Sequence, residues 1–209
     1  MNATSTARGV YLVTPDDADT DHLLASTRPL LDAITWLQYR NKQANATLRF
    51  EQASALHALC VQAGVPLIIN DDAELAERIG AAGVHLGAND GDIVEVRARL
   101  GPDAIVGAGC YNQLDRAERA VAAGASYIGF GAFFASPSKR TTFRADPSLL
   151  RGAAPLDVPR VAIGGMTPDN CIAAVEAGAE LIATISSVYS ASDPLAVLRA
   201  YRQRLGLDT

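Results

Sequence analysis

The sequence lacks an apolar run of the roughly 20 residues that a membrane-spanning helix needs, and its first residues lack the charged-then-apolar order of a secretory signal. It also has only three cysteines, Cys60, Cys110 and Cys171, which lie far apart in the chain. This spacing fits neither a disulfide framework nor a zinc site. We therefore expect a cytoplasmic protein with no membrane partner, whose thiols are reduced and serve mostly in packing.

Positive charge is scarce as well. The 18 Lys and Arg residues are outnumbered by 23 Asp and Glu residues, which gives a formal net charge of -5 at pH 7. A nucleic-acid-binding protein normally carries a clustered basic face, so we do not expect nucleic acid as a partner. Basic residues near a candidate site therefore need a local explanation.

The overall composition is that of an ordinary globular protein, with 49% hydrophobic and 20% charged residues. A length of 209 residues fits one domain with a real core. We predict a single domain over residues 1–209, in which residues 1–8 form a disordered tail. The sequence leaves the oligomeric state open, a homo-oligomer included.

One local pattern occurs four times: a helix-like stretch ends in a glycine, and a short apolar run follows directly. The glycines are Gly64, Gly83, Gly124 and Gly178, and the strands predicted after them cover residues 65–69, 84–86, 125–128 and 179–182. Four more strands are predicted at residues 10–13, 34–40, 104–108 and 160–163. Between the strands, segments such as 53–63, 73–79 and 117–123 have the apolar spacing of amphipathic helices.

Alternating strands and helices predict a parallel sheet covered by helices, because parallel strands need long crossover connections. Eight such units in 209 residues favour a compact (β/α)8 TIM barrel. The alternative is a doubly wound open sheet, but residues 13–17, after the first predicted strand, contain no glycine for its usual phosphate-binding fingerprint. In a barrel enzyme the active site lies at the C-terminal ends of the strands, so polar residues there need explaining.

The second predicted strand ends with Gln38, Arg40 and Lys42, which alternate along an extended chain and so face the same side. An arginine can grip an oxyanion through two donors, and a lysine adds a compact positive charge. We therefore predict a diphosphate site here. The alternative is a strand that runs into a solvated loop.

Oxygen donors also follow the next two predicted strands. Asn70 and Asp71 end the third strand, and Asp90 comes shortly after the fourth. Carboxylates at neighbouring strand ends can share Mg2+ with a substrate phosphate, so we predict that Asp71 and Asp90 are magnesium ligands. Taken singly, each aspartate is better explained as a residue at a helix start, which is the role we predict for Asp72.

A long segment without predicted secondary structure follows the sixth strand and carries Ser136, Ser138 and Lys139. Loops of this length are usually functional or disordered, and hydroxyl and ammonium donors suit a phosphorylated ligand. We predict that this segment covers the active site. A merely solvated loop is the alternative.

Gly164 and Gly165 end the seventh predicted strand, and Ile185 and Ser186 end the eighth. The loops after these two strands often bind phosphate in barrel enzymes, through backbone N–H groups. We therefore predict a second anion site at these four residues. A helix is predicted to begin at Thr167, which is followed by a proline.

His85 lies inside an apolar strand, and we expect a hydrogen-bonded wall residue there rather than a metal ligand. No arrangement of serine, histidine and aspartate reads as a catalytic triad. The chemistry should therefore depend on charge stabilisation rather than on a covalent enzyme intermediate.

Together these segments resemble the thiamine phosphate synthase family over residues 11–187. The motifs that carry the resemblance are residues 38–42 (QYRNK), 70–72 (NDD), 87–90 (GAND), 136–139 (SPSK) and 163–165 (IGG). Members of that family are (β/α)8 barrels that join hydroxymethylpyrimidine diphosphate to hydroxyethylthiazole phosphate and release diphosphate. The resemblance implies a Mg2+-dependent transferase of thiamine biosynthesis, whose partners are these two small molecules.

The resemblance also implies residue roles and a mechanism. Diphosphate binding falls to Gln38, Arg40 and Lys42 with Asn70 beside them, metal binding to Asp71 and Asp90, contacts from the covering loop to Ser136, Ser138 and Lys139, and thiazole phosphate binding to Gly165, Ile185 and Ser186. The implied mechanism is dissociative: diphosphate leaves first, and the thiazole nitrogen captures the pyrimidine cation. Arg40, Lys42 and Lys139 are then the expected catalytic residues.

The chain departs from the family pattern at several positions. Gly109 stands where a serine is usual, Ala88 where a glutamine is usual and Ala135 where a proline is usual, and serines replace the threonines of the covering loop. If the missing hydroxyl at Gly109 normally helps diphosphate to leave, turnover is slow or altered. Two alternatives therefore stay open: a thiazole tautomerase, which needs neither the diphosphate grip nor the metal, and a catalytically inactive barrel that binds a phosphorylated ligand.

Overall fold

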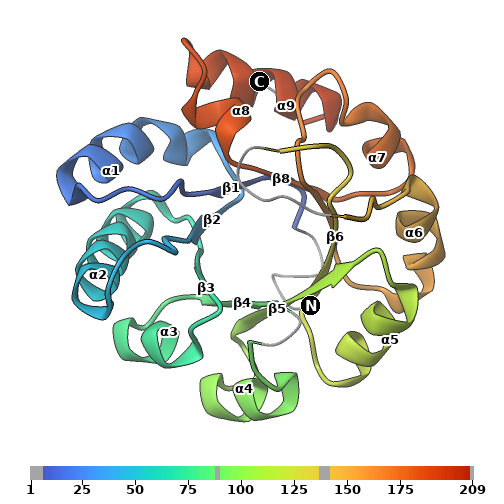
Figure 1. Ribbon diagram of the computed structural model, residues 1–209, viewed down its shortest axis with the longest axis horizontal. Coiled ribbons are helices and arrows are strands. Elements are labelled where there is room, and N and C mark those ends of the chain that lie inside the picture. Colours follow the sequence, from blue (N-terminus) through green and yellow to red (C-terminus); the bar gives the residue numbers. More distant parts are fainter. Residues whose placement is uncertain (1–6, 88–89, 137–141, 208–209) are drawn as a thin grey trace.

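The computed structural model describes residues 7–87, 90–136 and 142–207, which form one closed barrel of eight parallel strands (Figure 1). The strands are β1 (Gly9–Val13), β2 (Trp36–Tyr39), β3 (Leu67–Asn70), β4 (Gly83–Leu86), β5 (Ile105–Tyr111), β6 (Tyr127–Phe130), β7 (Arg160–Ile163) and β8 (Leu181–Thr184). Each strand pairs with its neighbours in the sequence, and β8 closes the ring by pairing with β1. The predicted (β/α)8 fold is confirmed, and the open-sheet alternative is wrong.

The helices form an outer ring around the strands (Figure 1). In the described part of the chain they are α1 (Thr20–Thr27), the 3-10 helix η1 (Arg28–Ala33), α2 (Ala46–Ala63), α3 (Ala73–Ile79), α4 (Ile93–Leu100), α5 (Leu114–Ala122), α6 (Pro147–Gly152), the 3-10 helix η2 (Ala154–Leu156), α7 (Ile172–Glu176), α8 (Ser186–Tyr189) and α9 (Pro194–Arg204). The helical connections return the chain to the starting edge of the sheet, so that consecutive strands run parallel.

Most strand residues are buried, because one core fills the barrel and another layer lies between strands and helices. The interior is filled by side chains that include Tyr11, Trp36 and Tyr127, whose rings meet edge to face or tilted. Gly107 of β5 makes room for them, since a Cβ there would clash with the Tyr127 ring. These aromatic rings form a floor beneath the open C-terminal end of the barrel.

Glycines end several helices where the sequence predicts them. Gly64 caps α2 with a φ of 68°. The prediction that Gly83 ends a helix is wrong, because Gly80 caps α3 and Gly83 is the first residue of β4. A Cβ at Gly83 would clash with the backbone of Ile105, so glycine there permits the close approach of β5.

Five strands begin later than predicted: β2, β3, β5, β6 and β8. β6 begins at Tyr127 and β8 at Leu181, although the apolar runs start at residues 125 and 179. The reason is that the backbone N–H groups of Ala125 and Ala179 still donate to carbonyls of the preceding helices. The first residues of each apolar run therefore complete a helix end before the strand starts.

The prediction of a helix beginning at Thr167 is wrong, because α7 begins at Ile172. The Thr167 backbone N–H donates to Asn170 Oδ1 at 2.8 Å, and the Asn170 N–H donates to Thr167 Oγ1 at 3.3 Å. Asn170 Nδ2 also donates to the carbonyl of Gly165 at 2.9 Å. These side chains stabilise a turn that ties the segment to the end of β7, in place of a helix.

The start of the described chain lies against its end. Ala7 is buried, and Arg8 Nε donates to the carbonyl of Leu205 at 3.0 Å. The cysteines are buried free thiols, as predicted. No described helix has both the length and the apolar character needed to cross a membrane.

Candidate active site

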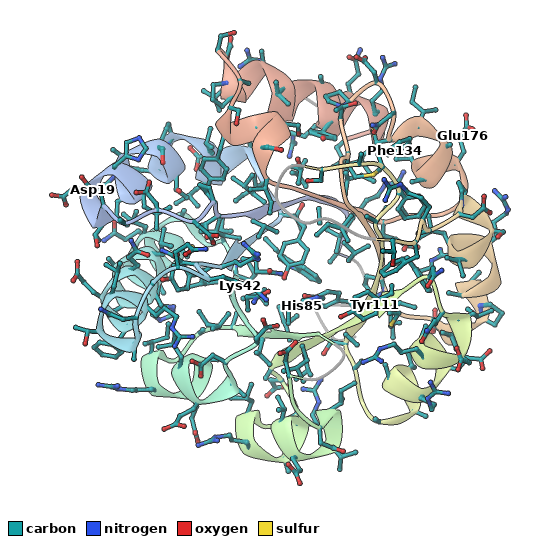
Figure 2. All side chains as sticks on the ribbon, viewed as in Figure 1. Asp19, Lys42, His85, Tyr111, Phe134 and Glu176 are labelled. Carbon is teal, nitrogen blue, oxygen red and sulfur yellow. The ribbon has the colours of Figure 1, made fainter. Side chains whose placement is uncertain are left out.

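A cavity of about 270 Å³ lies at the C-terminal ends of the strands. Of the predicted site residues, those that line it are Gln38, Arg40, Lys42, Asn70, Asp71, Asp90, Ser136, Gly164, Gly165, Ile185 and Ser186. Ser138 and Lys139 lie outside the described residues. Figure 2 shows Lys42, His85 and Tyr111 toward the centre of the barrel and Asp19 and Glu176 at its periphery. Residues predicted from separate strand ends thus meet in one pocket.

Arg40 and Lys42 follow β2 and are held in place by residues that follow β1. Arg40 Nη1 donates to Asp16 Oδ1 at 3.1 Å, and the Lys42 backbone N–H donates to the same oxygen at 2.9 Å. Thr14 Oγ1 donates to the Arg40 carbonyl at 3.0 Å and accepts from the Arg40 N–H at 2.9 Å. The Lys42 side chain is 55% exposed. A fixed guanidinium and an accessible ammonium therefore border the same part of the cavity, an arrangement suited to several negative charges.

Gln38 is buried on the cavity floor, at one end of a chain of hydrogen bonds. Its Nε2 donates to the Tyr11 hydroxyl (2.7 Å), which lies 2.7 Å from the Tyr127 hydroxyl, itself 2.9 Å from His85 Nδ1. Burial raises the pKa of both tyrosines, so their hydroxyls stay protonated. Gln38, Tyr11, Tyr127 and His85 thus form one continuous hydrogen-bonded chain across the floor.

Asp71 and Asp90 bring two carboxylates together beside Lys42. Asp71 follows β3 with a φ of 63°, a left-handed conformation that aspartate adopts more readily than most residues, and its Oδ2 lies 3.3 Å from Lys42 Nζ. A Cβ at Gly87 would clash with Asp90 Oδ2 and lie 3.7 Å from Asp71 Oδ1, so both carboxyl groups flank this glycine. Partial desolvation, followed by the charge of Asp71, raises the pKa of Asp90, and Lys42 opposes this.

This pair of carboxylates fits a divalent cation. Two like charges in a partly desolvated site favour a counter-charge, and Mg2+ is usually held by one or two carboxylates together with substrate phosphate and water. No cluster of three or more His, Cys, Asp or Glu side chains occurs among the described residues, so substrate and water would complete the coordination. Asp72 is not part of the pair: it caps α3 by accepting from the Leu75 N–H at 2.9 Å, as predicted.

A second candidate anion site lies after β7 and β8. Among the described residues, the backbone N–H groups of Gly165, Met166 and Ser186 donate to no protein acceptor, and all three residues line the cavity. Such groups can hold an anion without a side-chain charge. Gly165 has a φ of 63°, and a Cβ there would clash with the carbonyl of Ala135. Glycine therefore allows the backbone at Ala135, after β6, to approach this site closely.

β5 ends in an irregularity between Gly109 and Tyr111. Tyr111 has a φ of 54°, and its ring packs edge to face against Phe143 with the centroids 5.5 Å apart. A Cβ at Gly109 would lie 3.4 Å from His85 Nε2, which is an ordinary contact. A Cβ is therefore accommodated at Gly109, where the sequence is expected to depart from the family pattern. Ala88, another position expected to depart from the family pattern, lies outside the described residues.

Sequence reasoning missed several residues that shape the pocket. Tyr11, Tyr127 and Thr184 line the cavity directly, and Asp16 holds Arg40. The available signal was a hydroxyl within an otherwise apolar predicted strand, because a buried hydroxyl needs a partner. Tyr11 and Tyr127 contact each other from β1 and β6, two strands that are not neighbours in the sheet, so the sequence does not pair them.

Comparisons of sequence and of structure all match this chain to thiamine phosphate synthases. The family model described as thiamine monophosphate synthase matches residues 10–188. The thiamine-phosphate synthase of Xanthomonas campestris pv. campestris (strain 8004) is 59% identical over 202 residues, which cover 97% of this chain and 98% of the relative. That of Xylella fastidiosa (strain Temecula1) is 58% identical over 200 residues, covering 96% and 86%. The solved thiamine phosphate pyrophosphorylase of Pyrococcus furiosus has a TM-score of 0.83 at 27% identity and covers 97% of both chains.

Proposed function

Because the chain belongs to the thiamine monophosphate synthase family, we propose that it joins hydroxymethylpyrimidine diphosphate to hydroxyethylthiazole phosphate, giving thiamine phosphate and diphosphate. The observation that carries this proposal is a single cavity with two anion-binding regions of different chemistry. One region presents the side-chain cations Arg40 and Lys42, and the other presents backbone N–H groups after β7 and β8. A reaction between a diphosphate and a monophosphate needs two such regions in one pocket.

The diphosphate of the pyrimidine substrate occupies the region of Arg40 and Lys42, beside Asn70. Arg40 is held by Asp16, so its guanidinium is oriented before the ligand arrives. Fixed donors of this kind stabilise charge that develops on a leaving group without a cost of reorientation. Asp71 and Asp90 would hold Mg2+, which supplies positive charge to the departing diphosphate.

The pyrimidine ring lies over the cavity floor, within reach of Gln38. The amide of Gln38 is held by a hydrogen bond to Tyr11, and His85 is held by a hydrogen bond with Tyr127. The polar groups of the floor are therefore fixed in position before the substrate binds. The phosphate of the thiazole substrate lies at Gly165 and Ser186, with Gly164 and Ile185 beside them. Holding both reactants in one cavity converts their encounter into a step within a single complex.

The bond between the pyrimidine methylene carbon and the diphosphate oxygen breaks first, and both bonding electrons leave with diphosphate. The thiazole nitrogen then donates its electron pair to the pyrimidine cation. Arg40 and Lys42 stabilise the departing negative charge, and Lys139 and Ser138 act from the covering loop together with Ser136. No residue forms a covalent bond with substrate in this scheme.

We place the reaction in the cytoplasm, since three free buried thiols are typical of a protein from a reducing compartment. The partners are the two small molecules and Mg2+. Neither nucleic acid nor a membrane takes part in this scheme.

The test is a mixture of the purified protein, both substrates and Mg2+, in which thiamine phosphate and diphosphate are followed by chromatography. We expect equal amounts of the two products, loss of both with a chelator, and loss of both in Lys42→Ala. Arg119→Ala, which removes an exposed cation on α5 paired with Asp115, is the matched control and should keep full activity. A lack of product at saturating substrates would instead favour the tautomerase or the inactive barrel.

A further inference from the structure

Tyr201 of the C-terminal helix α9 lies behind the backbone anion site rather than in the cavity. Its side chain is fully buried, and its hydroxyl donates to the carbonyl of Met166 at 2.7 Å. The same hydroxyl lies 2.9 Å from Ser187 Oγ, and Ser187 Oγ lies 2.6 Å from Thr184 Oγ1. Met166 follows Gly165 directly, and Ser187 follows Ser186. Tyr201 therefore contacts both backbone segments of the anion site, the one after β7 through Met166 and the one after β8 through Ser187.

The direction of each hydrogen bond follows from counting protons. Burial raises the pKa of Tyr201, so its hydroxyl has one proton, which goes to the carbonyl of Met166 because a carbonyl can only accept. Tyr201 must then accept from Ser187, and Ser187 must accept from Thr184. The chain runs in one direction, from the end of β8 to the loop after β7, and Tyr201 is its central member.

The Met166 segment is held from a second side by Asn170. Asn170 Nδ2 donates to the carbonyl of Gly165, and Asn170 Oδ1 accepts from the N–H of Thr167. In a trans peptide unit the N–H points away from the C=O. Binding of the Gly165 carbonyl by Asn170 therefore turns the N–H of Met166 in the opposite direction, and Tyr201 fixes the next peptide unit along the chain.

We propose that Tyr201 is a positioning residue for phosphate: through Met166 and Ser187 it fixes the spacing between the two backbone segments that bind the anion. This inference rests on the proposed phosphate site and extends it to a helix outside the cavity. Without the hydroxyl, the two segments lose their common partner. The spacing between their N–H groups is then no longer fixed.

The experiment is calorimetric titration with inorganic phosphate and, separately, with the thiazole phosphate, using the full-length protein and Tyr201→Phe. The variant keeps the ring and removes one oxygen atom. We expect the Kd for both ligands to rise by about 3- to 10-fold, the value expected for one lost hydrogen bond. Inorganic diphosphate with Mg2+ binds the other region, so its Kd should stay within about twofold of the wild-type value. A change of about twofold is smaller than the change expected for one lost hydrogen bond.

Tyr39→Phe is the matched control for loss of a buried hydroxyl. Tyr39 is 2% exposed, and its hydroxyl donates to Gln52 Oε1 at 2.9 Å, on the β2 side of the barrel. We expect this variant to lose thermal stability comparably but to bind inorganic phosphate as the wild type does. Ser187→Ala, which removes only one link to Tyr201, should give a smaller rise in Kd than Tyr201→Phe.

The outcomes separate this proposal from the proposed function. Unchanged phosphate affinity in Tyr201→Phe, or an equal loss in Tyr39→Phe, would overturn the positioning role even if the wild type makes thiamine phosphate. Phosphate binding that weakens only in Tyr201→Phe and Ser187→Ala supports it, even if no product forms. A wild type that binds no phosphate at all would overturn the positioning role together with the phosphate site.

Discussion

Gly165→Ala should damage both stability and phosphate binding, because glycine is required there for two physical reasons. The residue has a φ of 63°, which costs a residue with a Cβ about 1–2 kcal/mol. The added methyl would also lie 2.8 Å from Phe134 Cβ and clash with the carbonyl of Ala135. Overpacking of this kind costs about 1–3 kcal/mol more. The expected loss in the free energy of unfolding is therefore about 2–5 kcal/mol.

Gly80→Ala provides the matched control, because Gly80 has a φ of 69° and no atom lies within 4 Å of its added Cβ. It should lose only the backbone cost of about 1–2 kcal/mol. Urea unfolding followed by circular dichroism measures both losses, and titration with inorganic phosphate measures binding. We expect at least about a tenfold weaker phosphate Kd for Gly165→Ala and no change for Gly80→Ala, since displacement of the loop needs more than about 1.4 kcal/mol. Equal losses of stability with equal phosphate affinity would refute the reasoning.

Three other substitutions test separate parts of the pocket. Asp71→Asn keeps a residue that tolerates a positive φ but removes one charge, so the Mg2+ concentration for half-maximal rate should rise at least about tenfold; an unchanged Mg2+ dependence would exclude Asp71 as a ligand. Gly109→Ser adds a Cβ that is accommodated, and it should raise the single-turnover rate about tenfold if the missing hydroxyl slows diphosphate departure; no gain counts against that idea. Tyr127→Phe removes the hydroxyl that links Tyr11 to His85 Nδ1, so the free energy of unfolding should fall by about 1–3 kcal/mol. Urea unfolding followed by circular dichroism measures the loss, and an unchanged free energy of unfolding would contradict a stabilising role for this hydroxyl.

Local sequence patterns predict the number, order and direction of the strands, because the apolar period and the glycine helix ends are local properties. These patterns give a wrong prediction where a tertiary contact, rather than the local sequence, determines why a residue is present. Gly83 has the appearance of a helix end, but it is needed for the close approach of the β5 backbone. Thr167 has the appearance of a helix start, yet its hydroxyl pairs with Asn170, whose amide is also bound to Gly165. In both cases a distant or unexpected partner decides the conformation.

The candidate site also contains residues that the sequence predicts and residues that it does not. Arg40, Lys42 and Asp71 were predicted because charged residues at strand ends stand out in an apolar sequence. Tyr11 and Tyr127 were not, because their hydroxyls meet across the barrel from positions 116 residues apart in the chain. Closure of the barrel creates such pairs, and no local pattern contains them.

The two anion regions respond differently to mutation because one uses side chains and the other uses the backbone. Substitution of Arg40 or Lys42 removes charge directly while the strand stays in place. At Gly165 the proposed binding groups are backbone N–H groups, which every residue except proline carries. Substitutions there alter binding mainly by changing the path of the backbone. Asn170 and Tyr201, which hold this backbone in place, can therefore determine phosphate affinity although they do not face the proposed phosphate site. A search for phosphate affinity determinants on this side of the barrel should begin with the residues behind the backbone rather than with those that face the ligand.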